Sequence, residues 1–308
     1  MPLRLSTTKP RGTVGLDIDG RFLAAVQAAG GRLERVVSAE LPDGTVHDGE
    51  VVNSDGLSQE LRSFFKSNDL PRTVRLGIAN QQIVVRQIEL PEIDGHAERA
   101  AAVRFQAAEA IAMPLDDAVL DYQIVSRDPD AEGNPRMQVV IVAARRGMVE
   151  RLVQAVKGAG LKPVSVDLDA FALVRALARH DGNDFGAHVF CHLGGVTNLA
   201  IAVGELCLFT RPLSAAWDGG GAASVIADEI RLSLDYYMTQ PGARAVHDVV
   251  LSGPGSKDQA FVDELSSHIG LDVSVAAPLG RFNATEVPGG ELPQRFTVAV
   301  GLAMGETA

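Results

Sequence analysis

The chain contains the same arrangement of short apolar strands and tight turns twice, and this duplication limits its possible folds more than any other feature. Three strands joined by turns are expected over residues 13–41 and again over 188–213, about 175 residues later. A helix and a further strand follow each copy. Solenoid repeats are much shorter, roughly 20–50 residues. The pattern therefore predicts an α/β protein with two similar lobes, each a five-stranded mixed sheet flanked by helices, and a cleft between them.

The pattern changes between the two copies. Over residues 83–168 it indicates a strand, a helix, two strands and a second helix, followed by a returning strand. We expect a small α+β subdomain inserted in the first lobe. The first lobe is then expected at 13–82 and 169–186, and the second at 187–308, closed by a helix at 293–304. Residues 1–12 are expected to be flexible.

Charge and hydropathy exclude several classes of partner. The formal net charge of -11 argues against a surface that follows a nucleic-acid backbone. No apolar run approaches the roughly 20 residues of a membrane helix, and residues 1–12 lack the apolar core of a signal peptide. We therefore expect a cytoplasmic protein. Cys191 and Cys207 are expected on strands too far apart to form a disulfide, as small core residues.

Three glycine-containing turns are candidates for binding a phosphate or an adenosine, because backbone N–H groups beyond a strand end can form an anion-binding concavity. The first follows the opening strand, the second occupies the same position in the second copy, and the third ends a strand near residue 252. In an alternative interpretation these residues only shape turns. The candidate contacts, mostly through backbone, are Asp17, Gly20, Gly194, Gly195, Thr197, Asn198, Gly253 and Gly255.

These stretches, in this order, resemble the actin-like ATPase superfamily and in particular the PilM family of type IV pilus assembly proteins. The resemblance covers about residues 13–305. It is carried by the opening Gly-Leu-Asp-Ile turn at 15–18, the insertion, the strand-to-helix step at 166–173, and the segments 197–199, 209–211, 229–237 and 251–253. It implies an actin-like fold, a possible site for ATP and Mg²⁺, and a role as a cytoplasmic adaptor or scaffold. It also implies a partner, a PilN-like inner-membrane protein whose N-terminal cytoplasmic peptide the chain would bind, so that contact with the membrane runs only through that partner.

The candidate nucleotide site departs from the family pattern. Asp19, Gly20 and Arg21 stand where the family has a small Gly-Ser-Ser run, so a second carboxylate lies where phosphate would approach. His192 replaces an aspartate that would orient Mg²⁺, and Pro254 replaces a glycine of the adenosine turn. None of the five lysines lies in a candidate turn. We expect weak or lost ATP binding, with no catalytic and no metal-ligating residue assigned.

Several alternatives stay open at the level of sequence. The chain could be an active actin-like ATPase that slowly hydrolyses ATP, an FtsA-like filament-forming protein, or the PilM-like cytoplasmic half of a secretion protein. The residues that bind the peptide are unassigned, although the strand at 83–91 could border a groove between the insertion and the first lobe. The sequence also leaves open whether the chain self-associates.

Overall fold

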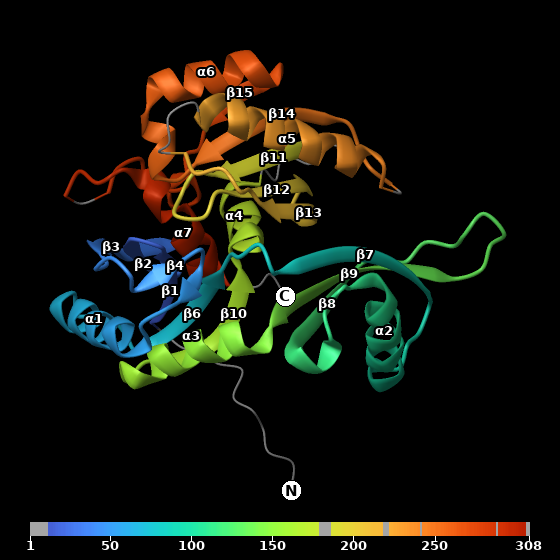
Figure 1. Ribbon diagram of the computed structural model, residues 1–308, viewed down its shortest axis with the longest axis horizontal. Coiled ribbons are helices and arrows are strands. Elements are labelled where there is room, and N and C mark those ends of the chain that lie inside the picture. The colour runs from blue at the N-terminus through green and yellow to red at the C-terminus, as the bar shows by residue number, and fades with distance from the viewer. Residues whose placement is uncertain (1–11, 179–185, 218–221, 241, 288, 306–308) are drawn as a thin grey trace, which may run out of the picture.

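The computed structural model describes residues 12–178, 186–217, 222–240, 242–287 and 289–305. Most of the segment 1–12 that was expected to be flexible lies outside these residues. Two five-stranded sheets dominate the chain, one above the other in Figure 1. The first has the order β10-β6-β1-β2-β3 and the second β13-β12-β11-β14-β15. Their strands are β1 (Thr13–Asp19), β2 (Phe22–Ala29), β3 (Arg32–Glu40), β6 (Thr73–Ile78), β10 (Lys162–Leu168), β11 (Ala187–His192), β12 (Asn198–Val203), β13 (Leu206–Pro212), β14 (Val246–Ser252) and β15 (Asp272–Val275).

The two sheets repeat the same topology. In each, the first three strands form an antiparallel meander, and the fourth and fifth strands add in parallel on the other side of the first strand. Parallel neighbours need crossover helices, which are α1 (Ser54–Ser67) and α3 (Arg146–Gly158) in the first lobe and α5 (Ala222–Met238) and α6 (Gln259–Ile269) in the second. The expected α/β fold with duplicated five-stranded sheet units is confirmed.

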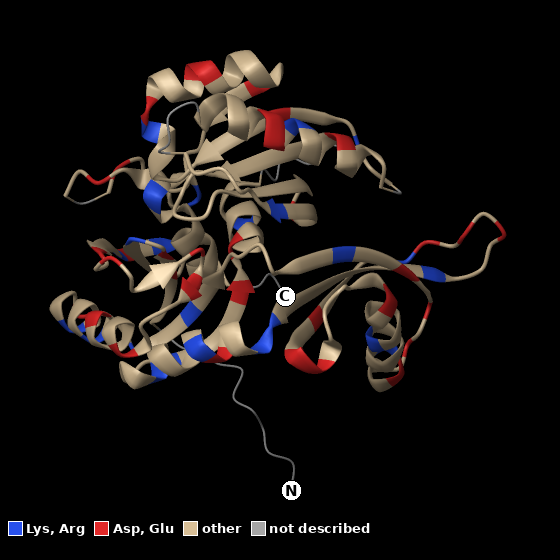
Figure 2. Cartoon of the chain, viewed as in Figure 1, with Lys and Arg blue, Asp and Glu red and all other residues tan. Residues whose placement is uncertain are grey.

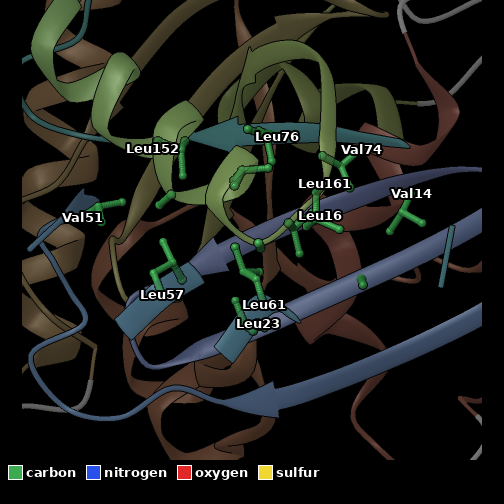
Figure 3. Close-up of a cluster of buried hydrophobic side chains, with 14 of the residues drawn as sticks. Val14, Leu16, Leu23, Val51, Leu57, Leu61, Val74, Leu76, Leu152 and Leu161 are labelled. Atoms are coloured by element: carbon green, nitrogen blue, oxygen red, sulfur yellow. The ribbon is translucent and has the colours of Figure 1, made fainter. Parts of the chain in front are cut away.

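The first lobe is held together by an apolar core between its sheet and helices α1 and α3. Figure 3 shows Leu16 and Leu76 of the sheet beside Leu57 of α1 and Leu152 of α3. Each side chain of this kind contributes about 1.5–3 kcal/mol when fully buried. Asn53 starts α1, because its side chain accepts a hydrogen bond from the N–H of Gly56. Two short strands, β4 (Val46–His47) and β5 (Glu50–Val51), pair beside this core.

The insertion is smaller than expected. Its own sheet has the order β7-β9-β8 and comprises β7 (Val84–Pro91), β8 (Ala118–Ser126) and β9 (Arg136–Arg145), with α2 (His96–Ala110) packed on one face. In contrast, α3 packs in the first-lobe core and β10 pairs with β6 of the first-lobe sheet. The expected range 83–168 thus includes two elements of the first lobe. The apolar face of α3 predicted that the helix is buried but not against which sheet.

Helices α4 (Asp169–Leu177) and α7 (Thr297–Met304) lie between the two sheets (Figure 1). They touch closely, because a Cβ atom added to Gly301 of α7 would lie 1.8 Å from the carbonyl oxygen of Ala172 in α4. A Cβ atom on Gly15 of β1 would likewise lie 2.1 Å from the carbonyl oxygen of Ala299. The helix expected at 293–304 to close the second lobe begins at Thr297, and it packs on the first-lobe sheet instead. No helix in the described part of the chain has the length and apolarity needed to cross a membrane.

Candidate functional site

The first two predicted turns meet across the cleft. Asp19, at the end of β1, accepts hydrogen bonds through Oδ1 from the backbone N–H groups of Gly195 (2.5 Å) and Val196 (3.3 Å). The two lobes are thus joined directly by a carboxylate of the first lobe and a backbone turn of the second. The sequence placed these turns opposite each other but did not predict that a side chain would fill the space between them.

The glycines of both turns are needed for this contact. A Cβ atom on Gly194 would lie 2.5 Å from Oδ2 of Asp19, and one on Gly195 would lie 2.7 Å from Oδ1. Gly20 has φ +58°, and its added Cβ would lie 3.4 Å from the Cα of Gly195. All three glycines therefore allow the close approach of one turn to the other.

The third turn is closed by packing within the second lobe. Gly253, with φ +83°, donates its N–H to the carbonyl oxygen of Gln294 (3.1 Å). Gly255 donates to the carbonyl oxygen of Leu193 (3.1 Å), and a Cβ atom on it would lie 2.8 Å from the ring of Trp217. The face at which an adenosine was expected is covered by a tryptophan. Trp217 and Gln294 had no sequence signal, because their role depends on which loop packs there.

Thr197 and Asn198 are buried at the start of β12. The carbonyl oxygen of Thr197 accepts a hydrogen bond from the N–H of Leu213 (2.7 Å), and Asn198 Oδ1 accepts one from the hydroxyl of Thr210 (3.4 Å). The Thr197 hydroxyl has no partner among the described residues. These two residues therefore tie β12 to β13 and its continuation.

Three carboxyl groups lie close together at the first turn, those of Asp17, Asp19 and Asp169. Asp17 is 2% exposed, and its pKa is raised well above 3.8 by burial and then by the charges of Asp169 and Asp19. Asp169, in the first turn of α4, has a pKa raised to about 8, mainly by burial and then by Asp19 and Asp167. Its Oδ1 has no partner among the described residues. A cavity of about 20 Å³ beside Asp19 and Asp169 has room for one water molecule.

This cluster lacks the geometry of a metal site. Among the described residues no group of three or more His, Cys, Asp or Glu side chains is arranged to hold a metal ion. The Nδ1 atom of His192 lies 2.8 Å from the hydroxyl oxygen of Ser252. Burial lowers the pKa of His192, which favours the neutral imidazole.

The raised pKa of Asp169 has a consequence for stability. Between pH 3.8 and about 8 the unfolded chain releases a proton that the folded chain keeps, so the contribution of this group to stability falls as pH rises through that window. We expect Asp169→Asn, which cannot ionise, to show a smaller loss of melting temperature between pH 5 and pH 8 than the wild type. Thermal melts between pH 5 and pH 8 measure this difference in melting temperature. Asp43→Asn, at an exposed position, is the matched control and should follow the wild type, and parallel curves for all three proteins would contradict the expectation.

A second, larger cavity of about 390 Å³ lies between the insertion and the two lobes. One wall is the face of the insertion sheet that α2 leaves uncovered, and the other is formed by β10, α4 and the β12–β13 region. The strand at 83–91, expected to border such a groove, contributes none of the lining residues. The main lining residues are Val119, Asp121, Gln123, Val140, Val142, Val166, Asp167, Phe171, Arg175, Glu205 and Cys207.

The cavity is lined by apolar side chains together with polar and charged ones, among which acidic residues outnumber basic ones. Asp167 and Arg175 form a buried ion pair (2.6 Å), and Arg175 also donates to the carbonyl oxygen of Gly301 (2.9 Å). Asp121 forms no ion pair among the described residues and accepts a hydrogen bond only from the N–H of Tyr122 (2.8 Å). Glu205 lies 3.5 Å from Arg281. In the view of Figure 2 acidic and basic residues are interspersed over the whole chain, and no basic face stands out.

A family model described as type IV pilus assembly protein PilM matches residues 15–185. A solved PilM-PilN type IV pilus biogenesis complex is similar, with a TM-score of 0.82 and 24% identity, covering 96% of this chain and 98% of that one. MreB5 of Spiroplasma citri bound to ADP gives 0.55 at 11% identity, covering 96% of each chain. A third similar structure is the cytoplasmic domain of EpsL, an inner-membrane component of the type II secretion system of Vibrio cholerae. Its TM-score is 0.52 at 13% identity, covering 96% of each chain. The fold is therefore actin-like.

Proposed function

The chain belongs to the family of type IV pilus assembly protein PilM, and we propose that it is a cytoplasmic adaptor that binds the N-terminal cytoplasmic peptide of a PilN-like inner-membrane protein. Its contact with the membrane then runs through that partner. The fold shared with a chain solved as part of a PilM-PilN complex supports this assignment.

The observation that carries the proposal is the cavity of about 390 Å³ between the insertion and the lobes. Its volume is at the low end of ligand sites, roughly 300–1,000 Å³, which suits a few side chains of an extended peptide. Two strands that line it, β8 and β10, are end strands of their sheets, and among the described residues each pairs on one side only. Their free edges offer backbone hydrogen bonds to an added strand, while the cavity selects alternate side chains.

The charges around the cavity indicate the chemistry of the peptide. Arg175 is already paired with Asp167, whereas Asp121 has no cationic partner among the described residues. Apolar lining residues such as Val140, Val142 and Phe171 favour aliphatic or aromatic side chains. We therefore expect an apolar peptide segment that also carries a basic group, which would lie near Asp121.

Nucleotide does not enter this function. ATP and Mg²⁺, which the fold family implies, do not fit the residues present: the N–H groups of Gly195 and Val196 are taken by Asp19, and Gly255 is covered by Trp217. We propose that ATP binding is weak or lost and that the chain has no ATPase activity. Calorimetry with MgATP and a phosphate-release assay test this. Micromolar binding that is lost in Gly194→Glu would overturn it, and turnover lost in Asp17→Ala would favour the alternative of an active ATPase.

Co-sedimentation tests the adaptor role on the intact chain. The chain should sediment with vesicles that carry the full-length PilN-like protein, and remain in the supernatant with empty vesicles or with vesicles that carry the partner without its N-terminal cytoplasmic residues. Equal sedimentation with the truncated partner would move the contact away from the N-terminal peptide.

A further inference from the structure

We propose that the Gly195–Val196 turn is an anion-binding site and that the carboxylate of Asp19 is its built-in anion, which holds the two lobes together without a bound ligand. The proposal concerns the cleft between the lobes and does not depend on the peptide site. It goes beyond lost nucleotide binding because it assigns Asp19 a positive role as the group that replaces a phosphate.

The geometry of the contact is that of an anion in a backbone concavity. Two successive N–H groups, of Gly195 and Val196, converge on one oxygen of Asp19 at 2.5 Å and 3.3 Å. The second oxygen lies against Gly194, where an added Cβ would be 2.5 Å from it. Both oxygens therefore contact the same turn, and a phosphate could enter only if Asp19 left.

These two N–H groups are the hydrogen-bond donors to Asp19 in the described part of the chain. None of the ion pairs in the described part of the chain involves Asp19, and the titratable groups near it are the carboxyls of Asp17 and Asp169 and the imidazole of His192. Burial favours the neutral form of each of these three groups. The described side chains around Asp19 thus do not offer it a cation, and its protein hydrogen bonds come from the opposite lobe.

The residue types around the contact fit this role. The Gly194–Gly195 pair leaves room for a side chain from the other lobe, and Gly20 allows β1 and β2 to turn immediately after Asp19. In this arrangement the carboxylate reaches from one lobe to the other, 176 residues away along the chain. Loss of the carboxylate should therefore loosen the second turn and leave its N–H groups open to an external anion.

The test uses Asp19→Ser in the full-length chain, with inorganic phosphate and MgATP as probes. We expect amide hydrogen exchange at 194–197 to become at least tenfold faster in Asp19→Ser, in phosphate-free buffer. We also expect millimolar phosphate to restore protection and raise the melting temperature of this variant, with no such response in the wild type. Asp43→Ser, the same change at an exposed aspartate, is the control and should match the wild type.

Asp19→Asn separates the contact from the charge. It keeps an oxygen acceptor, so it should retain more protection at 194–197 than Asp19→Ser. Unchanged exchange in Asp19→Ser, or a phosphate response of the wild type equal to that of the variant, would overturn the proposal. Faster exchange in Asp19→Ser without any response to phosphate or MgATP would show that the turn is not an anion-binding site. Because no readout uses the peptide, these outcomes are distinguishable from failure of the adaptor role.

Discussion

Val119→Arg should weaken binding of the PilN-like peptide by about 30-fold, which corresponds to about 2 kcal/mol on the scale of interface hot spots. Val119 lies on β8, lines the large cavity and is 39% exposed, so the substitution should not disturb the core. An arginine there occupies the space for the peptide. It also lies two residues from Asp121 on the same face of the strand, where it can pair with the carboxylate expected to receive the basic group of the peptide. Fluorescence anisotropy with a labelled peptide measures the loss.

The matched control is Phe105→Arg. Phe105 is on α2, on the other side of the insertion sheet, and is 67% exposed without lining the cavity. This variant should bind the peptide as the wild type does. Equal affinities for Val119→Arg and the wild type would move the peptide out of the cavity, and equal losses in both variants would indicate a general effect on the insertion.

Gly301→Ala should destabilise the chain by about 3 kcal/mol, although alanine is the better helix former by roughly 1 kcal/mol. The added methyl group would lie 1.8 Å from the carbonyl oxygen of Ala172, so α7 and α4 would have to separate. These helices connect the two sheets, and every residue of α7 from Thr297 to Ala303 is buried. The midpoint of urea unfolding measures the effect.

Gly280→Ala makes the same chemical change where an added Cβ meets no atom within 4 Å. Its stability should stay within about 0.5 kcal/mol of the wild type, as is usual for open positions. A Gly301→Ala chain as stable as Gly280→Ala would show that the α4–α7 contact is not close-packed.

The sequence predicted the fold well, because local patterning determines strands and turns. The duplicated meander and the crossover helices follow from apolar alternation and glycine turns, and the observed sheet orders confirm them. The bounds of the insertion were less predictable. The apolar stripe of α3, with Met148, Leu152 and Val156, shows that one face is buried, but the first-lobe core and the insertion core are equally apolar targets.

The candidate site was harder to predict from the sequence than the fold. The sequence singled out the first two turns as candidate phosphate-binding turns, which stays a prediction, and the structure brings Asp19 and Gly195 of these turns into contact. Asp169 and Trp217 were not predicted to be part of the site, because their positions depend on how α4 and a distant loop pack. A groove between the insertion and the first lobe was expected, but its lining residues could not be predicted, since its walls come from three parts of the chain that are far apart in sequence.

Calorimetric titration of the N-terminal cytoplasmic peptide of a PilN-like protein into the intact chain measures directly whether the chain binds this peptide. We expect one peptide per chain, with the same Kd within about twofold in the absence and presence of MgATP, and a loss of affinity in Val119→Arg but not in Phe105→Arg. Absence of binding, or binding that appears only when MgATP is added, would contradict it.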